Sequence, residues 1–529
     1  MARTDVRFNT QGMSFPLLTS QSGRSVIDAS GDLTYIPDMT AEGDIPVDRG
    51  VPGMFYAENV MPTAYGWSSA GYETLIDTPV GITGTFEDIV LIHGGQPSGD
   101  SIVSTGERTY LGVVNNAGTK LLHYVTAAGD WVPVAFIPTW TEDLPLTTAF
   151  VNGYSYIMIP HVGLYVFDIG ANTLSYRVLT GLDDTTIQGI AASAGYLIVY
   201  TATAAFWSSV VDVEDFVPTD VSGSGGGNIQ ELEGDIVYCK PTQMGFTIYS
   251  TSNVVTATYS GNSTYPFEYR ALPGGGGVSN KHLVSDTDAQ GYQYTLGTNG
   301  LQKVSPLNAA PAHATVTDFL NGDKFEAFDY ATNIVVLFDA VSPMVRSIQT
   351  VANRFVVVSY ANSLVPPYTF AIVIDTVLQR MGKLKVTHSR CLEYKSLLVG
   401  SSVDSAGSIA FMQEDGTIVT LDLSSESVTA QGVMLLGKMQ LQHSRMTQLQ
   451  EVEVENTSVL DNFAMLDVQS LDGRHLDTPA IVGYLNPQDG TSPIKRYLFS
   501  GVATSHSLLF KGAFELVTIL ASFNNHGRR

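Results

Sequence analysis

Between positions 150 and 179 the sequence reads Phe150-Val-Asn-Gly-Tyr-Ser-Tyr-Ile-Met-Ile159, then Gly163-Leu-Tyr-Val-Phe-Asp-Ile169, and then Thr173-Leu-Ser-Tyr-Arg-Val-Leu179. Aromatic and β-branched residues dominate each segment, and a short polar turn separates it from the next. This pattern is typical of short antiparallel strands that are joined by tight turns. The stretch therefore predicts a small antiparallel meander.

The same theme returns along the chain, at Gly195-Tyr-Leu-Ile-Val-Tyr200, Gly245-Phe-Thr-Ile-Tyr249, Gly291-Tyr-Gln-Tyr-Thr295 and Arg354-Phe-Val-Val-Val-Ser-Tyr360. A repeat of roughly 40 to 50 residues that holds several short strands is the signature of propeller blades. One such unit cannot bury both of its faces, so the units must close into a ring. We expect an all-β chain with a β-propeller of six or seven irregular blades, at about 86–134, 146–179, 188–220, 234–270, 282–340, 346–386 and 392–423.

Three regions follow from this pattern. Residues 1–80 are interrupted by Pro16, Pro37, Pro46, Pro52 and Pro62, and proline lacks the donor that a central strand needs. We therefore expect an extended N-terminal arm at 1–80 that lies on another surface, the propeller at 81–425, and a small β domain at 426–529. The last region is either a sheet or sandwich appended to the ring, or the final strands of the ring. The block 282–340 is long enough to hold an insertion, and the best short helix candidate lies around 310–320.

The composition excludes several classes of protein. A net charge of -24, with only 27 Lys and Arg, argues against general nucleic-acid binding, because phosphate contacts need cations. It is compatible with a surface that DNA passes without adhering. Cys239 and Cys391 are too few and too far apart for a disulfide framework. No signal peptide and no membrane span of about 18 apolar residues is apparent, so we expect synthesis in a cytoplasm and a soluble chain.

The sequence offers no pattern for catalysis or for a cofactor. Asp286, Asp288 and Gln290 resemble the opening of a calcium loop, but the glutamate expected six residues after Gly291 is missing, so an acidic hairpin turn is the preferred interpretation. Neighbouring carboxylates such as Asp183 and Asp184 suit solvated loops better than the facing pair of a glycosidase. No zinc or serine-nucleophile motif is present. We therefore expect no enzyme, no cofactor and no metal.

Two glycine-rich stretches interrupt the blades, and no Gly-Lys-Ser/Thr or predicted helix follows either of them, as a phosphate loop would require. They are either flexible loops or places where the backbone approaches a partner or a narrow channel closely. As candidates for a channel constriction or an interface between copies we take Gly223, Gly225, Gly226, Gly227, Gly274, Gly275, Gly276 and Gly277.

The region between Phe206 and His282 carries a resemblance to a known family. It contains Asp212-Val-Glu-Asp-Phe-Val-Pro218, Gly223-Ser-Gly-Gly-Gly-Asn228 and Tyr259-Ser-Gly-Asn-Ser-Thr-Tyr-Pro-Phe267. Together with the upstream phrase Tyr56-Ala-Glu-Asn-Val-Met-Pro-Thr63, this pattern resembles the tail nozzle proteins of short-tailed bacteriophages, of the tail tubular protein B and packaged-DNA stabilisation types. The resemblance covers about a third of the chain and includes no catalytic signature.

The resemblance implies a structural virion protein, made in the host bacterial cytoplasm and located in the phage tail. About six copies would surround a channel, retain the packaged double-stranded DNA and pass it during ejection without sequence-specific binding. Its partners would be the tail adaptor and the tail fibres or spikes. Two alternatives from other classes are a propeller enzyme acting on glycans and a propeller that binds a receptor or carbohydrate. Convergent carboxylates would indicate the first, and exposed aromatic residues the second.

Overall fold

The computed structural model describes residues 3–13, 15, 23–27, 33–37, 47–48, 54–98, 101–135, 139–141, 144–168, 171–219, 222–262, 264–395, 397, 407–422, 431–441, 446–456, 463–470, 481–485 and 494–525. Strands dominate this part of the chain, and its single α-helix is α1 (Ala314–Asn321). No helix among these residues is long and apolar enough to cross a membrane.

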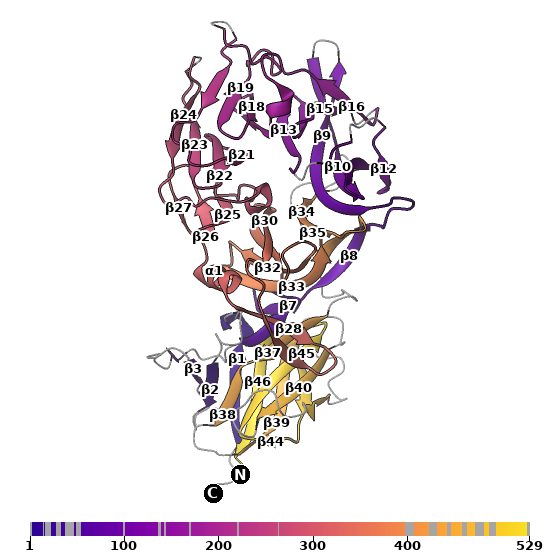
Figure 1. The fold of residues 1–529 in the computed structure, drawn as a ribbon. Coiled ribbons are helices and arrows are strands. Elements are labelled where there is room, and N and C mark those ends of the chain that lie inside the picture. The colour runs from indigo at the N-terminus through magenta and orange to yellow at the C-terminus, as the bar shows by residue number, and fades with distance from the viewer. Residues whose placement is uncertain are drawn as a thin grey trace.

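Six small antiparallel sheets and four strands of a larger sheet stand side by side around a common axis and form a β-propeller (Figure 1). In each blade the first strand lies nearest the axis, since these strands contact one another around the ring. Blades 1 to 3 are β9 (Thr85–Ser98), β10 (Ser101–Asn116), β11 (Thr119–Val125) and β12 (Trp131–Pro133); β13 (Thr147–Val151), β14 (Tyr154–Ile159), β15 (Gly163–Asp168) and β16 (Thr173–Arg177); and β17 (Gly189–Ser193), β18 (Tyr196–Tyr200), β19 (Ala204–Trp207) and β20 (Gly225–Asn228). Blades 4 to 6 are β21 (Ile236–Thr242), β22 (Gly245–Ser250), β23 (Val254–Tyr259) and β24 (Phe267–Ala271); β25 (Gln293–Gly297), β26 (Gly300–Val304) and β27 (Ala309–Pro311); and β30 (Val345–Val351), β31 (Phe355–Ala361), β32 (Tyr368–Asp375) and β33 (Arg380–His388).

Blade 7 closes the ring with a strand from the N-terminal region. It consists of β34 (Arg390–Tyr394), β35 (Ser408–Met412), β36 (Ile418–Asp422) and β8 (Gly71–Ile76), and β8 is its outermost strand. Between blades 7 and 1, Ile76 belongs to a core that includes Trp131 and Met412. The expected propeller is thus confirmed with seven blades. The described strands within residues 1–80 belong to sheets that they share with later strands of the chain.

The block at 282–340 does hold an insertion. After the three strands of blade 5 come α1, within the range where a short helix was expected, and the hairpin of β28 (Lys324–Asp329) and β29 (Ile334–Asp339). This hairpin extends away from the ring to the second part of the molecule (Figure 1). There Phe328 and Val335 pack against Leu435, Leu466 and Leu509.

The second part of the molecule is a β-sandwich that both ends of the chain build. Its core includes Val6, Leu436, Leu449, Phe510 and Phe523. One sheet contains β1 (Arg3–Asn9), β39 (Thr447–Asn456), β42 (Tyr484–Leu485), β43 (Ile494–Leu498), β44 (Val502–Ala503) and β46 (Glu515–Asn525). The other contains β2 (Gly23–Ile27), β3 (Leu33–Pro37), β4 (Val47–Asp48), β5 (Met54–Glu58), β37 (Gly432–Leu436), β38 (Lys438–Leu441), β40 (Phe463–Ser470), β41 (Ile481–Val482) and β45 (Ser505–Gly512).

A continuous sheet joins the ring to the sandwich. The outermost strand of blade 6, β33, pairs with β6 (Val60–Pro62), β6 pairs with β7 (Trp67–Ser69), and β7 pairs with β46 of the sandwich. At the crossing Gly382 is required, because a Cβ there would lie 2.4 Å from the carbonyl oxygen of Val60. The sandwich is therefore attached to the rim of the ring by hydrogen-bonded backbone.

Buried charges reinforce this joint. The carboxylate of Glu58 is inaccessible to solvent and accepts hydrogen bonds from the hydroxyls of Tyr56 (2.7 Å) and Tyr330 (2.9 Å), and Lys385 lies 3.4 Å away. Lys383, 2% exposed, donates to the backbone oxygen of Glu326 in the hairpin. Burial lowers the pKa of Lys383 to about 8, although Glu58 and Glu326 oppose the shift. The ring, the hairpin and the sandwich all contribute to one network.

This network predicts a pH dependence of stability. An unfolded lysine keeps its proton up to about pH 10.5, whereas Lys383 in the folded protein loses it near pH 8, so stability should rise with pH between these values. From about pH 7.5 to about pH 9.5 the free energy of unfolding of the wild type should rise by about 1–2 kcal/mol relative to Lys383→Met. Urea denaturation at both pH values measures this, with the exposed Lys324→Met as control. Equal pH dependence in wild type and Lys383→Met would contradict it.

Candidate functional site

The innermost strands enclose a cavity of about 530 Å³ on the axis of the ring. Charged side chains reach it from different blades: Asp88 from β9, Lys240 from β21, and Arg390 from β34. Lys281 and His282 come from the short 3-10 turn η4 (Lys281–Leu283), which precedes blade 5. The side chain of Asn280 accepts a hydrogen bond from the backbone N–H of His282 and so fixes the start of this turn.

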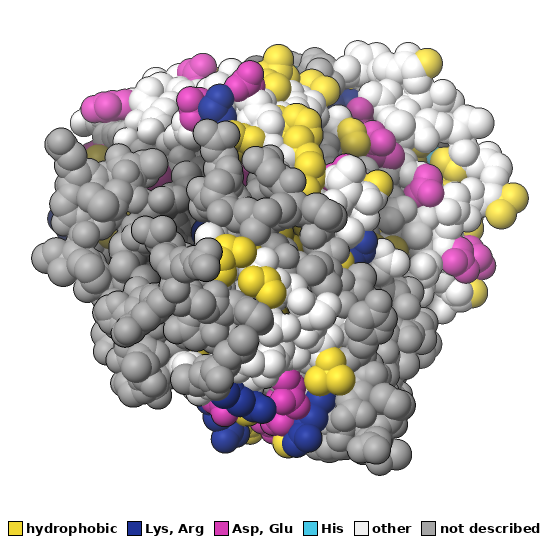
Figure 2. Space-filling view, turned by 90° about the horizontal axis from the view of Figure 1, so that it is seen from below, with side chains coloured by type: hydrophobic (Ala, Val, Ile, Leu, Met, Phe, Trp, Pro, Cys, Tyr) yellow, Lys and Arg dark blue, Asp and Glu magenta, His cyan; other side chains and the backbone are white. Residues whose placement is uncertain are grey.

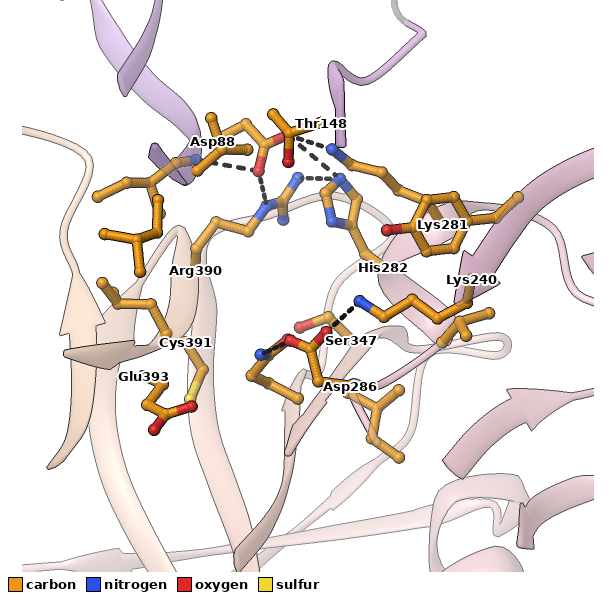
Figure 3. A pocket seen from close by; sticks show the side chains of 18 of the residues that line it. Asp88, Thr148, Lys240, Lys281, His282, Asp286, Ser347, Arg390, Cys391 and Glu393 are labelled. Carbon is orange, nitrogen blue, oxygen red and sulfur yellow. Dashed lines mark hydrogen bonds and ion pairs between the residues drawn. The ribbon is translucent and has the colours of Figure 1, made fainter. Parts of the chain in front are cut away.

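Asp88 is the centre of the first charge cluster (Figure 3). Its carboxylate lies 2.9 Å from Nζ of Lys281 and 3.4 Å from Nε of Arg390. Nη2 of Arg390 lies 2.9 Å from Nε2 of His282. Burial alone would raise the pKa of Asp88, but the positive charges of Lys281 and Arg390 hold it well below its usual range. Burial lowers the pKa of His282 far enough, with Arg390 adding to the effect, that this imidazole is neutral.

A second pair lies across the cavity. Lys240 forms an ion pair with Asp286, and Nε2 of Gln349 donates to the same carboxylate over 2.7 Å. Burial opposes both charges, yet their attraction raises the pKa of Lys240 and lowers that of Asp286. The arrangement links blades 4, 5 and 6 across the axis.

The Asp88 cluster also borders a neighbouring cavity. Asp88, His282 and Arg390 line a second cavity of about 410 Å³ as well, which Trp140, Leu146 and other side chains complete. The three residues therefore face both cavities.

The glycines singled out from the sequence lie elsewhere. Gly225, Gly226 and Gly227 belong to β20, the outermost strand of blade 3, and the carbonyl of Gly223 accepts a hydrogen bond from Nε1 of Trp207. A Cβ at Gly225 would lie 2.8 Å from the ring of Trp207, so the stretch packs closely against its own blade.

The second stretch connects blades 4 and 5, and a Cβ at Gly277 would lie 2.0 Å from the carbonyl oxygen of Thr251. Gly274, Gly275 and Gly276 are likewise close to residues of these two blades. The backbone at these glycines therefore approaches other atoms closely, and those atoms belong to the same chain. None of the eight glycines lines either axial cavity. Their role at a channel or an interface between copies stays a prediction.

The acidic turn at 285–291 has a structural role. Oδ1 of Asp288 accepts from the backbone N–H groups of Gln290 and Tyr292, and Oδ2 accepts from the hydroxyl of Tyr294. Asp286 instead faces Lys240, so the two carboxylates serve different partners. Within the part of the chain that the structure describes, no group of three His, Cys, Asp or Glu residues is arranged to hold a metal.

Sequence reasoning did not find the Asp88 cluster. Asp88 and Arg390 are 302 positions apart, and the cluster combines two blades and the turn of Lys281 and His282 without a local motif. The only signal available was the position of each residue at the start of a blade block, where an inner strand was expected.

Comparisons with known proteins found structural similarity at low sequence identity. No protein-family model and no curated protein matches the chain. The structure of YCF48 bound to D1 peptide is similar over 66% of this chain and 96% of that chain, at 12% identity and a TM-score of 0.35. The crystal structure of the WD40 beta propeller domain of Doa1 is similar over 67% and 97%, at 11% identity and a TM-score of 0.36. The strand pairings of the chain itself define an all-β protein that contains a β-propeller.

Asp88→Asn should destabilise the ring, because it leaves Lys281 and Arg390 buried without a counter-charge. We expect a loss of about 3–5 kcal/mol in the free energy of unfolding at neutral pH, measured by urea denaturation. Asp339→Asn removes a carboxylate from an exposed ion pair with Lys324 and should leave stability nearly unchanged.

The destabilisation caused by Asp88→Asn should depend on pH. Because the pKa of Asp88 is lowered from 3.8, its stabilising effect is present above that value and is lost as the pH falls toward the lowered pKa. The difference between the wild type and Asp88→Asn should therefore shrink in acid. A difference that is absent at neutral pH would contradict the assigned role.

Proposed function

We propose that this chain is a structural subunit of the tail of a short-tailed bacteriophage, in which several copies form the nozzle that retains packaged DNA and passes it during ejection. The observation that carries the proposal is the continuous sheet from blade 6 to the sandwich. Such a joint holds two bodies at a fixed angle, whereas separate domains joined by a linker move relative to each other. A wall that encloses DNA under pressure needs this stiffness.

The small size of the space inside the ring bears on where the DNA would pass. Asp88, His282 and Arg390 line this cavity of about 530 Å³, so in this proposal the conduit lies between copies of the chain and not through a propeller. Six copies around a central channel, as the sequence resemblance implies, satisfy this requirement.

The charges of the chain favour DNA that slides past it over DNA that binds to it. The net charge of -24 repels a phosphate backbone, and the 27 Lys and Arg that could bind phosphates are outnumbered by 51 Asp and Glu. At the sandwich end, Arg3 pairs with Asp5 (2.7 Å) and Arg496 pairs with Glu453 (2.8 Å). Seen from below, one group of basic and acidic side chains lies side by side at one edge, and further acidic side chains lie elsewhere in the view (Figure 2). Such mixed charges suit protein contacts better than a DNA-binding patch.

The carboxylates near the axis support a structural role over glycan hydrolysis. A glycosidase requires one carboxylic acid with a raised pKa and a second carboxylate facing it across the sugar. Cations hold the pKa of Asp88 and of Asp286 below their usual values, so neither is suited to act as the acid.

In this proposal the chain is made in the host bacterial cytoplasm and becomes part of the virion. Its partners are further copies of itself, the tail adaptor and the tail fibres or spikes, and double-stranded DNA passes without sequence-specific binding.

Electron microscopy of the virus that encodes this chain tests the proposal. A short epitope tag inserted at Gly118, in the turn between β10 and β11, should be tolerated, because a Cβ there meets no other atom within 4 Å. Gold-labelled antibody should bind at the end of the tail, and averaged images should have six-fold density there that accommodates the ring and the sandwich.

A tag at Gly261, another turn position with open space, serves as a matched control. It covers the case in which the tag at Gly118 is inaccessible to the antibody in the particle. Label on the capsid, or particles that lack the chain, would refute the proposal.

A further inference from the structure

The Asp88 cluster contains one positive charge more than its carboxylate can balance. Lys281 and Arg390 are 10% and 15% exposed at their side chains, and among the described residues Asp88 is the one carboxylate within ion-pair distance of either. Two buried cations thus share a single anion. Buried charges in proteins are ordinarily matched, since an unmatched charge loses its hydration without compensation.

The other charges in the cavity do not correct this imbalance. Lys240 is paired with Asp286, and Lys395 with Glu393 at 3.7 Å, so each of these pairs is neutral in sum. Consistent with an uncompensated cation, burial lowers the pKa of Lys281 even though Asp88 opposes the shift.

His282 offers a hydrogen-bond donor next to Lys281 and Arg390. Its Nε2 lies 2.9 Å from a guanidinium nitrogen of Arg390, which can only donate, so Nε2 accepts and the proton of the neutral ring is on Nδ1. No residue in the described part of the chain accepts a hydrogen bond from Nδ1. In Figure 3 the imidazole lies between the Asp88 cluster above and the Lys240–Asp286 pair below.

We propose that the axial cavity of the propeller binds a small organic anion whose carboxylate or phosphate group contacts Arg390, Lys281 and His282. A single negative charge at this place balances the cluster and accepts from the free N–H of the imidazole. The cavity of about 530 Å³ has the size of ordinary small-molecule sites. Thr148 and Asn353 on its wall supply neutral polar groups for the remainder of the ligand.

The site has a consequence for the ring. Asp88 belongs to blade 1, Lys281 to the turn before blade 5 and Arg390 to blade 7. An anion held by Lys281 and Arg390 therefore links parts of the ring that are far apart in the sequence. Binding stabilises the closed ring, because the ligand has affinity for the folded state alone.

Isothermal titration calorimetry on the full chain tests the proposal, with acetate and inorganic phosphate as separate probes in a dilute Tris chloride buffer. We expect saturable binding of at least one probe at one site per chain, and the tighter probe identifies the group that the ligand carries. Arg390→Met should weaken that binding by about tenfold or more, because it removes a charge-assisted hydrogen bond. Asp88→Asn should strengthen it by about tenfold, because it removes the competing anion.

Arg390→Met should weaken binding and Asp88→Asn should strengthen it. Either variant alone therefore still tests the proposal if the other fails to fold. Lys324→Met removes an exposed cation from the hairpin and should bind like the wild type, which excludes an effect of net charge. Thermal unfolding with and without the tighter probe should show a higher midpoint with it in the wild type and a larger increase in Asp88→Asn. Absence of saturable binding to the wild type by both probes, or unchanged affinity in folded Arg390→Met and Asp88→Asn, would overturn the proposal.

Discussion

The pairing of β8 with β36 is the constraint on which the rest of the structure depends. Blade 7 has only three strands of its own, and without a fourth its outer edge and the core around Ile76 would be exposed to water. Since β8 precedes every other strand of the ring, the two ends of the propeller are held in one sheet. The strands just before β8 are then placed at the rim, where β6 and β7 continue blade 6 into the sandwich.

This closure explains why the propeller could be predicted from the sequence and the placement of the N-terminal region could not. Alternating segments such as 154–159 and 163–168 specify strands locally, and their repetition implies a ring. The pairings of β8 with β36 and of β1 with β46 join segments from opposite ends of the chain, and no local pattern specifies them. The prolines suggested an irregular arm, yet Pro62 is the last residue of β6, where a missing donor costs little.

The same distinction holds for the candidate site. Asp286 was noticed because it belongs to a compact acidic turn, although its partner Lys240 comes from another blade. Asp88, Lys281 and Arg390 had no motif, since a ring brings inner strands together irrespective of their separation in sequence. The glycines were visible as a run, but their packing against Trp207 and Thr251 is a tertiary property.

The polar axis calls for an explanation beyond stability. Buried ion pairs contribute little net stability, and apolar side chains of similar volume often stabilise a protein at least as well. The spaces between blades are filled in that way, as the cluster of Val357, Ala371, Leu384 and Phe411 between blades 6 and 7 illustrates. If the ring were only a wall, apolar residues would also suffice at its centre. The charges of Lys281 and Arg390, together with the open volume beside them, are therefore better explained by a ligand than by the needs of folding.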